Sequence, residues 1–190
     1  REEWLTQLDT AIGDADHGAN MARGMSAVTE KLAASAPAAA DDLLKTVGMT
    51  LVSSVGGASG PLYGTFFLRM GMTTGAVQDL DATGLAAALR AGLEGIVARG
   101  KPAAGDKTMF DAMSPAVDAL DAAIAGGADL AEATQAAAVA AATGRDATLP
   151  LVARKGRASY LGERSAGHLD PGAASTALLF ETLAAAIAAS

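Results

Sequence analysis

Hydrophobic residues recur along most of the chain at intervals of three and four positions, which is the spacing of one face of an α-helix. One stripe predicts a helix over about residues 20–34, and its members are Met21, Met25, Val28 and Leu32. Seven other stripes predict seven more helices. They lie within residues 4–12, 44–55, 62–70, 85–96, 110–124, 130–142 and 171–187.

Proline and glycine mark several of the predicted helix ends. Pro61 opens the fourth helix, and Pro171 opens the eighth directly after the capping residue Asp170. Gly126 and Gly127 close the sixth helix. The connections are short, so successive helices are expected to be antiparallel neighbours. The predicted fold is an all-α bundle of eight antiparallel amphipathic helices.

The composition agrees with one helical domain. Of the 190 residues, 51% are hydrophobic but only 4% are aromatic, and strand-forming residues are scarce. This length suits a single domain over residues 1–190. The absence of cysteine fits a cytoplasmic protein. The chain begins at Arg1 rather than Met, so we expect that an N-terminal segment is missing.

Charge and hydropathy argue against two kinds of partner. The net charge is −7 and no basic stripe is present, whereas nucleic-acid binding needs lysine and arginine against phosphates. No uninterrupted run of 18 apolar residues occurs, because Glu181 interrupts the last long segment. We therefore expect neither nucleic-acid binding nor a membrane span.

The densest group of polar residues lies at the end of the first predicted helix. Asp9, Asp14 and Asp16 fall within eight residues, with Gly13 and Gly18 among and after them. On an unbroken helix Asp14 would point about 140° away from Asp9, so the helix must stop for the three carboxylates to meet. Glycine permits that break. Clustered carboxylates repel one another unless a cation lies between them, and oxygen ligands favour Mg²⁺ or Ca²⁺.

The calcium-binding loop of an EF-hand does not fit this segment. Counted from Asp14, that loop requires Asp or Asn at position five and Glu at position twelve, where the chain has Gly18 and Met25. Mg²⁺ presented to a phosphate-bearing ligand fits better, since Mg²⁺ takes few carboxylates. The alternative is an acidic helix end and turn, with His17 as a surface cap.

Four predicted connections are rich in glycine and polar residues: 13–20, 55–61, 99–109 and 156–172. In an up-down bundle the connections after the first, third, fifth and seventh helices fall at one end, which would assemble a single site. Residues 56–59 precede a helix N-terminus, where free N–H groups favour an anion. Residues 95–101 match the start of a phosphate-loop motif, but Pro102 replaces its final hydroxyl residue, so we reject that motif.

Taken together, these motifs are similar to a known family. The acidic segment, Gly-Gly-Ala-Ser-Gly-Pro (56–61), Gly-Asp-Lys-Thr-Met-Phe-Asp (105–111) and Ser-Tyr-Leu-Gly-Glu-Arg-Ser-Ala-Gly-His-Leu-Asp-Pro-Gly-Ala (159–173) occur in order. The chain resembles, over nearly its whole length, the L subunits of phosphotransferase-dependent dihydroxyacetone kinases. The resemblance implies a closed eight-helix barrel that binds ADP or ATP and two Mg²⁺ at one end.

The resemblance also assigns candidate site residues. Asp9, Asp14 and Asp16 would be the Mg²⁺ ligands, and Arg157 would approach the phosphates as the catalytic residue. The remaining candidates for nucleotide binding are His17, Gly18, Ala19, Asn20, Ala58, Ser59, Gly100, Met109, Asp170, Pro171 and Gly172. Met109 has core packing as its alternative, and Arg157 a solvated loop charge. No role is assigned to His168.

In such kinases the nucleotide stays bound, a phosphoryl-donor M subunit rephosphorylates it, and the phosphoryl group passes to dihydroxyacetone on a K subunit. Phosphoryl transfer requires mainly positioning and charge neutralisation, which carboxylate-bound metal and an arginine supply. We expect His17 to bind phosphate by a hydrogen bond rather than to carry a phosphoryl group. Two alternatives stay open: the nucleotide domain of an ATP-dependent kinase, and a non-catalytic regulator of a transcription factor.

Overall fold

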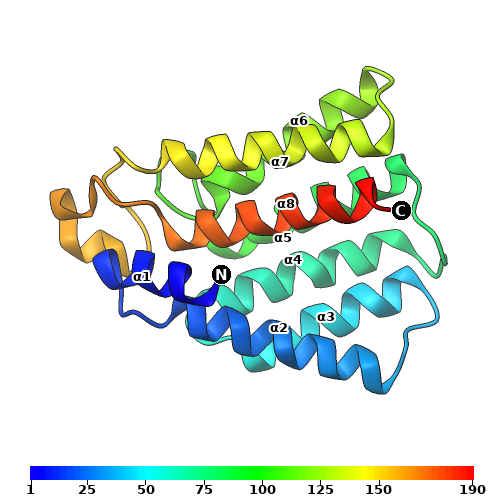
Figure 1. The fold of residues 1–190 in the computed structure, drawn as a ribbon, viewed down its shortest axis with the longest axis horizontal. Coiled ribbons are helices and arrows are strands. Elements are labelled where there is room, and N and C mark those ends of the chain that lie inside the picture. The colour runs from blue at the N-terminus through cyan, green and yellow to red at the C-terminus, as the bar shows by residue number, and fades with distance from the viewer. The chain divides into compact units, whose positions relative to one another are not determined.

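The computed structural model describes residues 1–190 as helices and loops without β-strands (Figure 1). The helices are α1 (Glu2–Ile12), α2 (His17–Ala34), α3 (Ala40–Ser54), α4 (Ser59–Thr74), α5 (Ala82–Gly100), α6 (Phe110–Ala125), α7 (Leu130–Ala147), the 3₁₀-helix η1 (Arg157–Ser165) and α8 (Pro171–Ala188). The predicted all-α class and all eight predicted helices are confirmed.

Two features differ from the sequence-based expectation. Helix η1 lies within 156–172, which we expected to be a connection because the sequence there is mostly polar. In the structure Ala158 and Leu161 of η1 pack against Ile12 of α1. Gly162, at φ 55° and ψ −132°, kinks it. Helix α2 begins at His17 rather than near Asn20, and α4 begins at Ser59, two residues before Pro61.

Backbone contacts divide the chain into two compact units. The first unit comprises residues 1, 3–18 and 102–190, and the second comprises residues 2 and 19–101. The first unit thus holds α1, α6, α7, η1 and α8. The second holds α3, α4, α5 and most of α2. That residues 1–190 form a single domain, and that the helices close into a barrel, stay predictions.

In the first unit, α7 packs against both α6 and α8. The buried face of α7 is made largely of alanine, which allows neighbouring backbones to approach closely. Gly144 marks the closest approach, since a Cβ atom there would lie 2.2 Å from the carbonyl oxygen of Asp111 in α6. Pro115 has no N–H to donate to that carbonyl, which is four residues earlier in the same helix.

In the second unit, α4 packs against α3 on one side and α5 on the other. Gly48 of α3 and Gly64 of α4 lie where these two helices touch, and a Cβ atom at either would come within 3.0 Å of the other's carbonyl oxygen. Tyr63 and Leu51 are completely buried beside this contact. Helix α4 begins directly after the glycine-rich segment 55–58.

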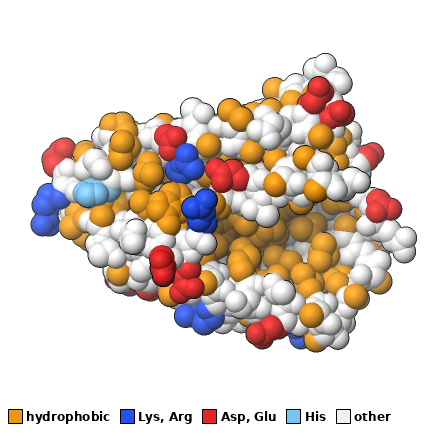
Figure 2. Space-filling model, in the orientation of Figure 1, with side chains coloured by type: hydrophobic (Ala, Val, Ile, Leu, Met, Phe, Trp, Pro, Cys, Tyr) orange, Lys and Arg blue, Asp and Glu red, His pale blue; other side chains and the backbone are white.

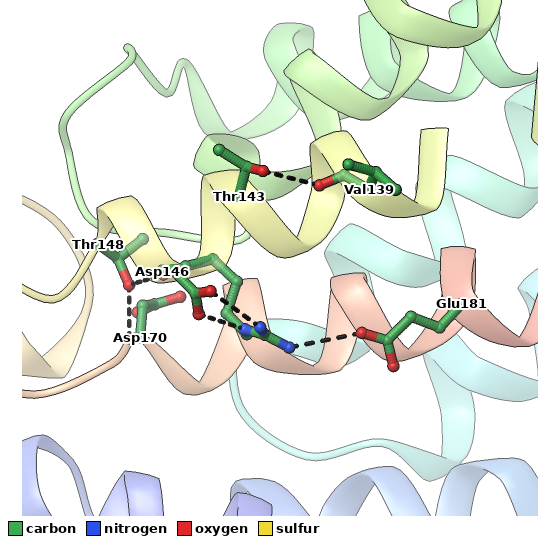
Figure 3. A network of polar contacts seen from close by, with 7 residues as sticks. Val139, Thr143, Asp146, Thr148, Asp170 and Glu181 are labelled. Atoms are coloured by element: carbon green, nitrogen blue, oxygen red, sulfur yellow. Dashed lines mark hydrogen bonds and ion pairs between the residues drawn. The ribbon is translucent and has the colours of Figure 1, made fainter. Parts of the chain in front are cut away.

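Helix α8 is long and apolar enough to cross a membrane by length and composition, with a mean hydropathy of 1.3. This is weak evidence, because core helices pass the same test. Glu181 of α8 pairs with Arg145 of α7, which also binds Asp146 (Figure 3). This polar contact, and the buried residues along α8, join it to the first unit. In the view of Figure 2, charged side chains are scattered among hydrophobic ones and form no basic stripe.

Candidate metal and phosphate site

The structure brings the three aspartates of the acidic segment together. One carboxylate oxygen each from Asp9, Asp14 and Asp16 lies within 4.8 Å of the other two. Asp9 is 7% exposed, whereas Asp14 and Asp16 are open to solvent. Three negative groups at this separation favour a cation between them, and an oxygen-only ligand set fits Mg²⁺. The residues present therefore fit a hard divalent cation.

Asp9 is held in place by the start of the next helix. Its Oδ2 accepts hydrogen bonds from the backbone N–H groups of Asp16 (2.9 Å) and His17 (3.1 Å). These are two of the N–H groups that the beginning of α2 leaves without a helical partner. Asp9 thus caps α2 from the last turns of α1, and this contact turns its carboxylate toward the other two aspartates.

The segment between the two helices needs unusual backbone geometry. A Cβ atom on Gly13 would lie 1.9 Å from Asp9 Oδ1, so only glycine fits there without moving the carboxylate. Ala15 has φ 64°, in the left-handed region that costs a non-glycine residue roughly 1–2 kcal/mol. Such strain is common where a binding site fixes the backbone.

Arg157, the first residue of η1, contacts the same cluster. Its Nη2 lies 2.9 Å from Asp14 Oδ2, and its side chain is 66% exposed. An exposed ion pair contributes little to stability. A carboxylate has lone pairs for both an arginine and a metal, so the pair is compatible with a cation at the cluster. The guanidinium has five N–H donors, so those that do not face Asp14 can donate to an anionic ligand there.

His17 connects the cluster to the first turns of α8. Its Nε2 lies 2.9 Å from Ser175 Oγ, and its side chain is buried. Burial lowers the pKa of His17, while the negative charges of Asp9 and Asp16 oppose that shift. In the absence of a bound anion the imidazole is therefore favoured in its neutral form, which suits a hydrogen-bonding role.

The N-terminus of α8 gathers three more predicted residues. Asp170 caps the helix by accepting a hydrogen bond from Ala173 N (2.7 Å), and Pro171 follows in the first turn. A Cβ atom on Gly172 would lie 3.3 Å from Met109 N, so the structure brings Met109 beside this helix start. Desolvation by burial raises the pKa of Asp170 to about 7.

Of the remaining predicted residues, Gly18 ends the first stretch of the first unit, and the others belong to the second unit. The Asn20 side chain lies against the loop before α4, since a Cβ atom on Gly56 would be 3.0 Å from it. Arg23 holds that side chain by donating to Asn20 Oδ1 (2.6 Å). Ala58 and Ser59 lie at the start of α4. Ala19 is exposed on α2, and Gly100 ends α5.

Three residues of this region were missed from the sequence: Lys107, Thr148 and Ser175. Thr148 is completely buried, and its Oγ1 accepts from the N–H of Asp170 (3.0 Å; Figure 3). Lys107 is 1% exposed. The segment 105–111 was noticed as a motif, but nothing in a sequence marks a lysine as buried. His168 is exposed, and its carbonyl oxygen accepts from Lys107.

Clustered carboxylates with an exposed arginine beside them, in an all-helical protein, fit the class of proteins that bind an anionic ligand together with a divalent cation. Comparison with known proteins narrows this class. Residues 11–185 match the DAK2 domain family. The chain therefore belongs to the DAK2 family.

Two relatives resemble this chain over most of their own length. The PEP-dependent dihydroxyacetone kinase, ADP-binding subunit DhaL, of Escherichia coli is 50% identical over 97% of this chain and 88% of that protein. The PEP-dependent dihydroxyacetone kinase 1, ADP-binding subunit DhaL, of Listeria innocua is 51% identical over 96% of this chain and 86% of that protein. The resemblance to dihydroxyacetone kinase L subunits is confirmed.

A solved structure shows a similar fold. The crystal structure of the dihydroxyacetone kinase from C. freundii in complex with AMP-PNP and Mg²⁺ has a TM-score of 0.74 and 28% sequence identity. The match covers 97% of this chain but only 30% of that chain. This protein thus corresponds to a part of that longer kinase.

Proposed function

We propose that this chain is the nucleotide-carrying subunit of a dihydroxyacetone kinase. It binds ADP or ATP with two Mg²⁺ and passes a phosphoryl group to dihydroxyacetone held on a separate K subunit. An M subunit then rephosphorylates the ADP in place. The observation that carries the proposal is the approach of three carboxylates within 4.8 Å, with Arg157 on one of them.

The three aspartates hold the metal in this proposal. Bound Mg²⁺ supplies neutralisation of the charge on the transferred phosphoryl group. Asp9 is pre-oriented by its two backbone hydrogen bonds, so little ordering is needed when the cation binds. Without a cation, the net charge of −7 and the exposed carboxylates would oppose a polyphosphate.

Arg157 and the neighbouring polar groups complete the site. Arg157 neutralises charge that develops on the phosphoryl group, which requires positioning rather than a nucleophile. His17 would donate a hydrogen bond to phosphate by exchanging one of its present contacts, which are with Ser175 Oγ and the Pro171 backbone. The other proposed nucleotide contacts are Gly18, Ala19, Asn20, Ala58, Ser59, Gly100, Met109, Asp170, Pro171 and Gly172.

One second candidate has an observation in its favour. The solved kinase that shares this fold is a longer chain, of which this chain covers 30%. A nucleotide domain of a one-chain, ATP-dependent kinase is therefore the alternative. The subunit hypothesis is favoured because this chain spans 88% of the length of the Escherichia coli DhaL subunit, to which it is 50% identical. A regulatory role toward a transcription factor and a cytoplasmic location stay predictions.

Replacing Asp16 by Asn tests the proposed function. The change removes one of the three carboxylates proposed to bind Mg²⁺, so Mg²⁺-dependent retention of ADP should be lost. Nucleotide content after gel filtration measures retention, and circular dichroism measures the helical fold. Asp42→Asn, an exposed acid on α3, is the matched control and should retain ADP. Full ADP occupancy in Asp16→Asn would contradict the metal assignment.

A further inference from the structure

Lys107 is a buried cation that the proposed chemistry leaves unused. Its side chain is 1% exposed, and its backbone adopts φ 62°, which a lysine rarely does. The Nζ atom donates to four backbone carbonyl oxygens, those of Thr148 (3.0 Å), Leu151 (3.0 Å), Ser165 (2.7 Å) and His168 (2.6 Å). The ammonium therefore lies in a ring of carbonyl oxygens.

The four acceptors come from both sides of the segment that carries Arg157. Two lie in 148–151, directly after α7, and two lie in 165–168, at and after the end of η1. Further bonds tie this segment: Ala153 N donates to Ser165 Oγ (2.8 Å), and Arg154 N donates to Asp106 O (3.0 Å). One ammonium thus closes a loop whose first helical residue, Arg157, meets Asp14.

Burying an ammonium is unfavourable unless its donors are all used. Burial lowers the pKa of Lys107, and the charge of Asp170 opposes this shift. A lysine has three donors, so four acceptors within 3.0 Å use them fully. The buried ammonium and the left-handed backbone of Lys107 are both unfavourable by themselves. They persist because the surrounding structure holds them, as is common at functional sites.

We propose that Lys107 is a positioning residue, which fixes Arg157 against the three aspartates by joining the two ends of the 148–168 segment. This proposal rests on the proposed function in one respect: it takes from it that Arg157 neutralises charge on the phosphoryl group. Lys107 touches neither the aspartates nor Arg157 and acts through the backbone alone.

A double-mutant cycle tests whether Lys107 acts through Arg157. Lys107→Met removes the ammonium at similar size, and single-turnover phosphoryl transfer to dihydroxyacetone is measured with the K subunit present. Arg157→Ala is expected to slow transfer by about 10²-fold, and Lys107→Met, by misplacing Arg157, should have a similar effect, with ADP retention changed far less. In the Arg157→Ala background, Lys107→Met should slow transfer no further. Multiplicative effects of the two changes would overturn the proposal.

Chemical rescue tests the carbonyl ring itself. Lys107→Gly accepts the left-handed backbone and leaves room for an ammonium ion. Ammonium chloride should slow amide hydrogen exchange in residues 148–168 of this variant, while sodium chloride should not. Lys101→Gly is the matched control, because Lys101 also has a positive φ (45°) but is exposed, and ammonium should not affect it. No ammonium-specific protection in Lys107→Gly would overturn the proposal.

The two experiments separate the two proposals. If the native chain transfers no phosphoryl group, the proposed function fails. Hydrogen exchange still reports then whether Lys107 orders residues 148–168. The positioning role alone is wrong if the native chain transfers the phosphoryl group but amide hydrogen exchange in residues 148–168 is the same in the native chain and in Lys107→Gly.

Discussion

At the residue scale, Asp9 combines a structural and a chemical role. Its Oδ2 satisfies the N–H groups of Asp16 and His17, which begin α2. The same carboxylate is one of the three that meet within 4.8 Å. Because a single group serves both purposes, the start of α2 and the geometry of the candidate metal site are coupled, and small shifts of Asp9 should alter ligand binding.

Gly13→Ala should weaken Mg²⁺-dependent nucleotide binding without unfolding the chain. The new Cβ would begin 1.9 Å from Asp9 Oδ1, so the carboxylate must move. Changes that misorient a metal ligand typically reduce affinity by about 10- to 100-fold. Titration calorimetry with ADP and Mg²⁺ measures the effect. Gly126→Ala, at φ −78°, is the control and should bind like the native chain. Equal affinities for Gly13→Ala and the native chain would count against a metal at Asp9.

These residues differ in how far the sequence could predict them. The three aspartates lie within eight positions, so helix geometry and charge repulsion alone indicate a shared site. Lys107 could not be predicted, because its acceptors are backbone carbonyls 41 to 61 residues further along the chain. A backbone carbonyl has no sequence signal, so such a contact needs the fold.

At the element scale, helix prediction succeeded where apolar residues recur at helical spacing. Stripes at intervals of three and four predicted α1 to α8. In α8, however, residues 173–177 are all buried, so its first turns are covered on every side. Helix η1 was missed because it is short and mostly polar: only Ala158 and Leu161 pack against Ile12, and hydrogen bonds that include those of the Lys107 ammonium hold the rest. Its one predicted residue, Arg157, came from the family resemblance and not from the pattern.

The N-cap of α8 should make stability depend on pH. Burial raises the pKa of Asp170 from 3.8 to about 7, so between these values the folded chain binds more protons than the unfolded chain. The contribution of Asp170 to the free energy of unfolding is therefore full below about pH 4 and falls as pH rises to about 7. The slope is at most about 1.4 kcal/mol per pH unit.

Asp170→Asn isolates this contribution, since asparagine also caps helices. The native free energy of unfolding minus that of the variant should fall between pH 4 and pH 7 and then level off. Urea denaturation in chelator and without nucleotide measures it. Asp129→Asn controls for the capping charge, because Asp129 caps α7 while exposed. A fall of equal size with Asp129→Asn would show that burial is not the cause.

At the scale of the whole molecule, charge limits what the chain can do alone. The chain has a net charge of −7, and its acidic cluster contains three carboxylates against the single guanidinium of Arg157. A nucleoside polyphosphate adds further negative charge, so a divalent cation is needed for it to bind. The candidate residues are proposed to contact metal and phosphate, and none is assigned to a small hydroxyketone. The acceptor is therefore expected on another subunit.

The chain should accordingly be inactive by itself. Mixed with dihydroxyacetone and excess Mg-ATP, it should release no dihydroxyacetone phosphate. With the K subunit added, about one phosphoryl group per chain should be transferred, because spent ADP leaves slowly and awaits rephosphorylation by the M subunit. Quench-flow detection of dihydroxyacetone phosphate measures the burst, and the K subunit with Mg-ATP alone is the control. Sustained turnover on free ATP without an M subunit would contradict the carrier role and favour an ATP-dependent kinase domain.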